Sequence, residues 1–159
     1  MPFPTLRSWC RDAGLVFSPR LYRDAPFLLA LLAGVAVGLG LYLFVKPHTG
    51  PMAPVSMAAG LMFVLAWPLA EEIVFRGVLQ GELQRTAWGA RGWHGITMAN
   101  VVTSLVFVAF HFINHPPLWA ASVIAPSLVF GYLRDRHASV WPAFLVHAFY
   151  NLVYLVALS

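Results

Sequence analysis

Charged residues are scarce in this sequence. Asp, Glu, Lys and Arg make up only 10% of its 159 residues, whereas 60% are hydrophobic, and the mean hydropathy is +0.73. A water-soluble domain carries charges on about a quarter of its residues to cover its surface. The scarcity of charge therefore excludes a soluble globular protein and predicts an integral membrane protein, for which the length allows one domain.

Cysteine is also almost absent, and no internal repeat or low-complexity segment occurs. The single cysteine, Cys10, excludes an internal disulfide and a cysteine-based metal cluster. The formal net charge of +4 could on its own indicate a nucleic-acid partner. The few charges lie at the ends of apolar runs, however, where they orient a chain in the membrane and contact anionic lipid. We therefore expect a lipid bilayer as partner and no nucleic acid.

Five apolar runs are candidates for helices that cross the bilayer, which takes about 20 residues. Some of these runs are slightly shorter than this length and others are longer. They cover residues 25–45, 55–83, 96–112, 117–133 and 140–158. The first is longer than the apolar core of a secretory signal and is expected to stay uncleaved. Its Gly34 and Gly38 form a GxxxG pair that allows close helix packing. Short loops join the runs, so residues 25–159 are predicted to form an all-α, polytopic transmembrane helical bundle, preceded by a basic interfacial segment at 1–24.

Arginines predict how the chain is oriented. If the five spans alternate, one side of the membrane carries Arg7, Arg11, Arg20, Arg23, Arg85, Arg91, Arg134 and Arg136. The other side carries Lys46 alone. Positive residues favour the cytoplasmic side, so we expect a multi-pass protein of the cell (inner) membrane with a cytoplasmic N-terminus and an external C-terminus.

Ionisable and strongly polar groups within spans are costly and by default indicate function. The second, third and fifth spans contain such groups, including Glu71, Glu72, Arg76, His111, His147 and Asn151, whereas the fourth contains no acidic, basic or histidine residue. A single histidine or Glu–Arg pair inside a helix is often structural. The occurrence of the whole set inside predicted spans favours a functional site.

Helical spacing separates the two adjacent glutamates. Glu72 and Arg76 are four residues apart with the glutamate first, the favourable order for an ion pair on one helix face. Glu71 lies about 100° around the helix from Glu72, so Arg76 serves it less well and its carboxylate is predicted to be available for chemistry. Pro68 removes a backbone hydrogen bond, and we expect the helix to kink or restart there, with both glutamates near the favourable end of a helix dipole.

The other two sets show the same spacing of four residues. His147 and Asn151 project from one face of the fifth span, and an imidazole and a carboxamide side by side can donate hydrogen bonds to an oxyanion. Phe107 and His111 place an aromatic wall beside a histidine that can orient a water molecule or help to deprotonate it.

These residues occur in three short motifs, EEIVFR (71–76), FVAFH (107–111) and HAFYN (147–151). In this order on membrane helices they resemble the CPBP family, also called ABI, the CAAX-protease and bacteriocin-processing group that includes the Rce1-type prenyl endopeptidases. The resemblance covers roughly residues 66–154. It implies an intramembrane endopeptidase of the glutamic type that needs no metal or other cofactor.

By position, the resemblance makes Glu71 the base that activates water, assisted by His111. It assigns the oxyanion hole to His147 and Asn151, and a supporting role to Glu72 and Arg76. The expected substrate is a membrane-associated protein or peptide, such as one with a leader or a C-terminal sorting tail. The prenyl endopeptidases have more spans than this chain, so a prenylated substrate is not implied, and no oligomeric state is predicted.

Two alternatives stay open on the sequence alone. Glu71, His111 and His147 are residue types that bind zinc with three protein ligands and a water, which would make the protein an intramembrane metalloprotease, although the helical HExxH pattern is absent. Alternatively, the same polar residues could bind a peptide between the helices without cleaving it, as in an immunity or scaffold protein.

Overall fold

The structure is a computed structural model that describes residues 14–16, 21–50 and 54–159. In chain order its elements are η1 (Leu21–Arg23), α2 (Ala25–Gly40), η2 (Leu41–Val45), η3 (Lys46–His48), α3 (Met57–Leu61), η4 (Met62–Ala66), α4 (Trp67–Glu71), η5 (Glu72–Gln80), α5 (Gly81–Gln84), β1 (Gly92–Trp93), β2 (Ile96–Thr97), α6 (Met98–His111), α7 (Pro117–Ser122), α8 (Ile124–His137) and α9 (Trp141–Leu158). The predicted all-α helical bundle is confirmed.

Three of the helices are long and apolar enough to cross a membrane. They cover Ala25–His48, Met57–Gln84 and Trp141–Leu158; we call the second, which carries the EEIVFR motif, the motif helix. The third predicted span forms the shorter α6, of 14 residues. The fourth is divided at Val123 into α7 and α8. The chain therefore has about five helices, as expected, of which the third and fourth are the shorter ones.

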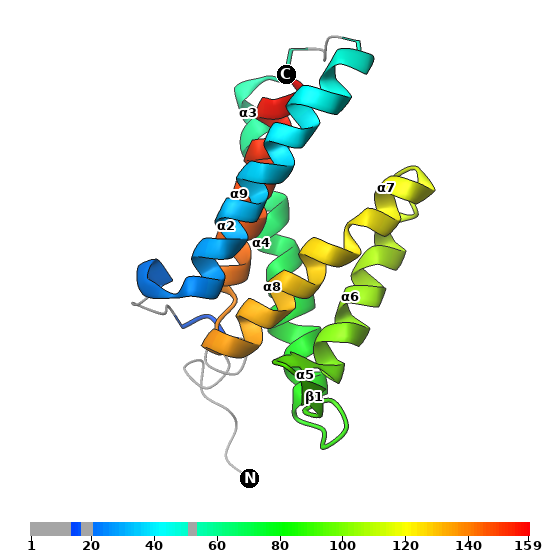
Figure 1. Ribbon diagram of the computed structural model, residues 1–159. Coiled ribbons are helices and arrows are strands. Elements are labelled where there is room, and N and C mark those ends of the chain that lie inside the picture. The colour runs from blue at the N-terminus through cyan, green and yellow to red at the C-terminus, as the bar shows by residue number, and fades with distance from the viewer. Residues whose placement is uncertain (1–13, 17–20, 51–53) are drawn as a thin grey trace.

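The helices pack side by side as a bundle (Figure 1). The most extensive contacts join α6 to α8, α2 to α9 and α8 to α9, and the motif helix contacts both α6 and α9. A buried apolar cluster lies among the first turns of α2, the last turns of α8 and the start of α9, and consists of Leu21, Phe27, Ala30, Phe130, Leu133, Ala143 and Val146. Many large apolar side chains face outward instead, as expected of a surface covered by lipid, including Leu29, Val37, Phe44 and Val156.

The GxxxG pair in α2 packs against α9, as its spacing predicts. A Cβ atom at Gly38 would lie 2.1 Å from Cγ1 of Val153, and one at Gly34 would lie 2.6 Å from the Tyr150 ring. Neither position has room for a side chain. The hydroxyl of Tyr150 then donates to the backbone carbonyl of Ala30, at 2.8 Å.

The motif helix does not restart at Pro68, which was one of the two outcomes, a kink or a restart, expected from the sequence. It continues through the proline because η4 is a turn of π-helix, in which the N–H of Trp67 bonds to the carbonyl of Met62. A wider turn at this point tolerates a residue that has no N–H and whose ring would collide with the preceding turn. Glu71 and Glu72 are consequently in the middle of a continuous helix, and no helix dipole begins beside them.

A small β-hairpin joins the motif helix to α6, which the sequence did not predict. Gly92 pairs with Thr97 and Trp93 with Ile96, while His94 and Gly95 both have positive φ, the backbone of the tight turn that suits hairpins. Thr97 accepts a hydrogen bond from the N–H of Asn100 and so starts α6 two residues later than expected.

Most of the predicted interfacial segment at 1–24 lies outside the described residues. Within the described part, the carbonyl of Gly14 accepts a hydrogen bond from the N–H of Val140, and Leu21 is buried. Asp24 begins α2 by accepting from the N–H of Phe27.

Candidate active site

Glu72 and Arg76 form a fully buried ion pair, as their spacing predicts. Nε of Arg76 lies 3.4 Å from Oε2 of Glu72, and both side chains are 0% exposed. The nine-residue π-helix η5 that carries them keeps a polar face toward α6 and α8, with Glu72, Arg76 and Gln80 all buried.

Arg76 is held from two further elements. Its Nη2 donates to both the carbonyl and the hydroxyl of Ser127 in α8, at 3.0 and 2.7 Å. The guanidinium also lies over the rings of Phe107 and Phe130, with centroids 4.7 and 5.5 Å away, a contact that favours a desolvated cation. Ser127 was missed by sequence analysis because a serine in an otherwise apolar run carries no distinctive pattern.

His147 connects the two glutamates. Its Nδ1 lies 2.8 Å from Oε1 of Glu72, and its Nε2 lies 3.7 Å from Oε2 of Glu71. The ring is stacked on Phe130, at 4.7 Å and 15° between planes, which fixes its orientation. Because a carboxylate is an acceptor, the hydrogen bond to Glu72 places a proton on Nδ1 and directs Nε2 toward Glu71.

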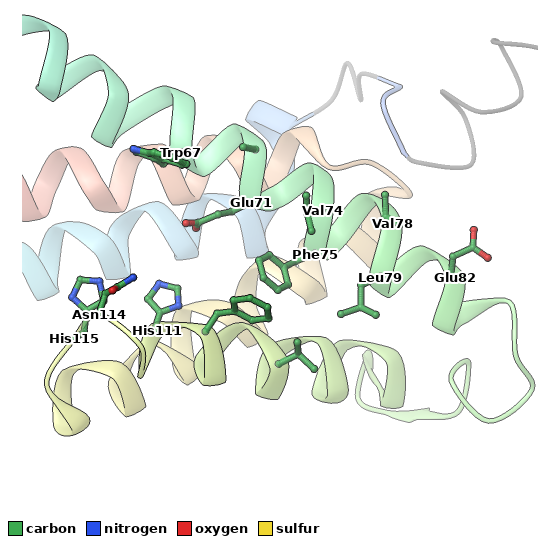
Figure 2. A pocket seen from close by; sticks show the side chains of 13 residues that line it. Trp67, Glu71, Val74, Phe75, Val78, Leu79, Glu82, His111, Asn114 and His115 are labelled. Carbon is green, nitrogen blue, oxygen red and sulfur yellow. The ribbon is translucent and has the colours of Figure 1, made fainter.

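Glu71 differs from its neighbour in facing open space. Its side chain is 31% exposed, against 0% for Glu72, and it lines a cavity of about 720 Å³ between the motif helix and the end of α6. Figure 2 shows the Glu71 carboxylate and the His111 ring directed into this cavity from the two helices. Most of the remaining lining is aliphatic and aromatic, including Val74, Val78 and Phe110, and Glu82 also lines it.

His111 has a defined hydrogen-bonding state. Its Nδ1 lies 2.8 Å from the carbonyl of Phe107, and since a carbonyl only accepts, Nδ1 carries a proton. In the neutral ring Nε2 is then the acceptor. The Phe107 ring packs against His111 at 4.4 Å between centroids, as the FxxxH spacing predicts.

The loop after α6 and the helix α7 add further rings beside His111, from His115 and Trp119 respectively. His115 stacks with His111 at 5.8 Å between centroids, and Trp119 lies 4.0 Å from His115. Desolvation of the ring, and secondly the neighbouring His111, lower the pKa of His115 below its ordinary value. Both effects favour the neutral form of the His115 ring, which lines the same cavity.

Asn151 lies one turn beyond His147 on α9, but its amide bonds elsewhere. Nδ2 of Asn151 donates to the backbone carbonyl of Phe63, in the motif helix, at 2.9 Å. No other hydrogen bond of this side chain is found among the described residues. His147 and Asn151 thus both contact the motif helix, two turns apart along it.

A second polar cluster, also missed from sequence, holds the motif helix against the start of α6 and the end of α8. Asp135 accepts hydrogen bonds from the amides of Gln80 and Gln84 and from the hydroxyl of Thr97. Nearby, Nδ2 of Asn100 in α6 donates to the carbonyl of Leu128 in α8, at 3.0 Å, and so joins these two helices. Asp135 was assigned to a loop because its run of charged neighbours is typical of a solvated connection.

Comparisons with known proteins agree with the three motifs. Residues 53–153, more than half of the chain, match the family model described as type II CAAX prenyl endopeptidase Rce1-like. Neither curated proteins nor solved structures include a significant match. The match contains both glutamates, Arg76 and the two motif histidines. The chain therefore belongs to the Rce1-like family of CAAX-type intramembrane endopeptidases.

Proposed function

We propose that the protein cleaves a peptide bond of a membrane-associated protein or peptide with a water molecule that Glu71 activates. The observation that carries this proposal is the difference between the two adjacent carboxylates. Glu72 is buried between Arg76 and His147, whereas Glu71 reaches the cavity opposite His111. A general base must be able to reach water and substrate, and only Glu71 of the pair meets this requirement.

The reaction proceeds by direct attack of water. Glu71, assisted by Nε2 of His111, takes a proton from water, and the oxygen adds to the scissile carbonyl carbon. The C–N bond then breaks, and the leaving amine takes up the proton from Glu71. Such base assistance is typically worth about 10²–10⁴-fold. No covalent enzyme intermediate forms.

His147 and Asn151 stabilise the oxyanion that forms on the carbonyl oxygen. Nδ1 of His147 is held by Glu72, so a donor at Nε2 is an imidazolium, whose positive charge the two carboxylates balance. Hydrogen-bond donors fixed before the reaction are worth about 10²–10³-fold each. Arg76 acts indirectly, because it holds Glu72 and through it His147.

We further propose that catalysis needs no metal. The Glu71 carboxylate and the His111 ring line the same cavity, which supports water activation by these two groups. Activity retained after exhaustive chelation is the expected result. Activity that returns only with added zinc would favour the metalloprotease.

The decisive experiment identifies the natural substrate. Membrane fractions from cells with wild-type protein or Glu71→Gln are compared by proteomics that records peptide termini. The expected result is a precursor that accumulates with Glu71→Gln and loses a leader or tail with wild type. His94→Asn removes a histidine from the exposed hairpin, where asparagine tolerates the positive φ, and should process like wild type. A peptide that co-purifies with wild type and is never cleaved would instead indicate a non-catalytic binding protein.

A further inference from the structure

The backbone of the motif helix contains a carbonyl without a helical donor. In a regular helix the carbonyl of Phe63 would accept from the N–H of Trp67, and in a π-turn from the N–H of residue 68. Trp67 donates to Met62 instead, and residue 68 is a proline without an N–H. Both ordinary donors of Phe63 are therefore lost.

A side chain of the neighbouring helix α9 supplies the missing hydrogen-bond donor. Nδ2 of Asn151 donates to the Phe63 carbonyl at 2.9 Å. Within a bilayer an unpaired backbone group is costly, and prolines in membrane helices are tolerated where a neighbouring helix supplies the missing partner. The hydrogen bond consequently has a large driving force in the membrane and restricts the Asn151 side chain to one orientation.

The same hydrogen bond leaves half of the amide free. Nδ2 carries two protons, and one of them is used by Phe63; the other has no acceptor among the described residues. Asn151 projects from the same face of α9 as His147, whose Nε2 is 3.7 Å from Glu71. A carboxamide fixed by one N–H can present its second N–H to an oxyanion without reorganisation, which is the condition for strong electrostatic stabilisation.

We propose that Pro68 is a positioning residue for catalysis, because it frees the Phe63 carbonyl that orients Asn151. This inference rests on the proposed function, in which Asn151 is an oxyanion donor. Pro68 itself does not touch the substrate. Pro68 acts on the Phe63 carbonyl, and this carbonyl in turn orients the Asn151 amide.

The test is a double-mutant cycle between Pro68→Ala and Asn151→Ala, measured as kcat and KM on the precursor identified above or on a peptide that spans its cleavage site. An alanine at 68 supplies the missing N–H, so the helix can satisfy Phe63 without Asn151. Pro68→Ala should lower kcat by about 10- to 100-fold, because a misplacement of about 1 Å can cost about 10²-fold. KM and thermal stability should not worsen, since alanine favours a helix interior over proline.

The cycle separates orientation from a general change in helix shape. In an Asn151→Ala background, Pro68→Ala should have no further effect on kcat, because the group that it disorients is already gone. Pro47→Ala is the matched control; Pro47 is exposed near the start of η3, away from the site, and its replacement should leave kcat unchanged.

Three results would overturn this inference alone. They are a wild-type kcat for Pro68→Ala, the same fold loss in both backgrounds, and loss of folding on Pro68→Ala. Absence of any cleavage by the wild-type protein would instead overturn the proposed function.

Discussion

Replacement of Glu72 by glutamine should reduce both stability and turnover, whereas replacement of Glu71 should reduce turnover alone. Glu72 is 0% exposed and is the counter-charge of Arg76, which is also 0% exposed. Removal of one partner from a buried pair costs roughly 3–5 kcal/mol, because the other charge is left buried and uncompensated. At about 2–4 °C per kcal/mol for a chain of this length, Glu72→Gln should lower the Tm by roughly 10 °C.

Glu71→Gln provides the comparison on the adjacent residue. Its carboxylate is 31% exposed and has one ionic contact, at 3.7 Å, with His147, so the Tm should change little. Turnover should fall by about 10²–10⁴-fold, the usual value of a general base. The two variants are compared in the same detergent by thermal unfolding and by cleavage of the same substrate.

A double variant separates the two roles of Glu72. Glu72→Gln with Arg76→Gln removes both charges and should recover part of the lost stability, as expected of groups in contact. Turnover should stay low, because Nδ1 of His147 no longer has a carboxylate partner at 2.8 Å. Equal behaviour of Glu71→Gln and Glu72→Gln, or a rescue of stability when Arg76→Gln is combined with Glu71→Gln, would refute the reasoning.

Three further predictions concern His111, Asp24 and the orientation of the chain in the membrane. His111→Asn should lower kcat by about 10²-fold or more, whereas His94→Asn, which removes an exposed imidazole in the hairpin, should not; equal losses would refute the role of His111. Burial of Asp24 acts to raise the pKa of its carboxyl, but the hydrogen bonds from Arg136 and the N–H of Phe27, together with the charges of Arg136 and His137, lower the pKa overall. The contribution of this carboxylate to stability should be present above its unfolded-state pKa and vanish as the pH falls through the lower folded-state pKa. In unfolding curves at several pH values, Asp24→Asn should lack this acid-side loss, and a wild-type profile in the variant would contradict the assignment. Reporter fusions at Ser159 should behave as external, and cytoplasmic behaviour would refute the orientation expected from the arginines.

The sequence predicted the features that depend on neighbours along one helix. The buried pair of Glu72 and Arg76 and the contact between Phe107 and His111 both follow from a spacing of four residues. The close packing of Gly34 and Gly38 likewise needed only the pattern and the absence of side chains. Composition alone was enough to predict a membrane-embedded helical bundle, because so many apolar side chains can avoid water only by contact with lipid or with one another.

Contacts between helices could not be predicted in the same way. The hydrogen bond between His147 and Glu72 joins residues that are 75 positions apart. The partner of Arg76, Ser127, lies in the fourth span, where the sequence showed no charged residue that would indicate a site. Of the kink or restart expected at Pro68, the restart was wrong, because the propensity of proline describes an α-helix, whereas the chain forms a π-turn just before it. The partner that the Phe63 carbonyl finds, the amide of Asn151, belongs to the neighbouring helix α9. The sequence around Pro68 therefore could not show it.

Stability alone does not account for the buried pair in the motif helix. Replacement of a buried ion pair by apolar residues of similar volume is often neutral or stabilising, and an apolar pair at 72 and 76 would suit a membrane helix well. Such a pair could not hold Nδ1 of His147 at 2.8 Å or direct its Nε2 toward Glu71. Arg76, with Ser127 and two aromatic rings around it, places a positive charge beside Glu72 at a depth where a lone carboxylate would be costly. The contacts beneath Glu71 are therefore best explained by the orientation of His147, and an apolar pair at 72 and 76 should give a protein that folds without cleaving its substrate.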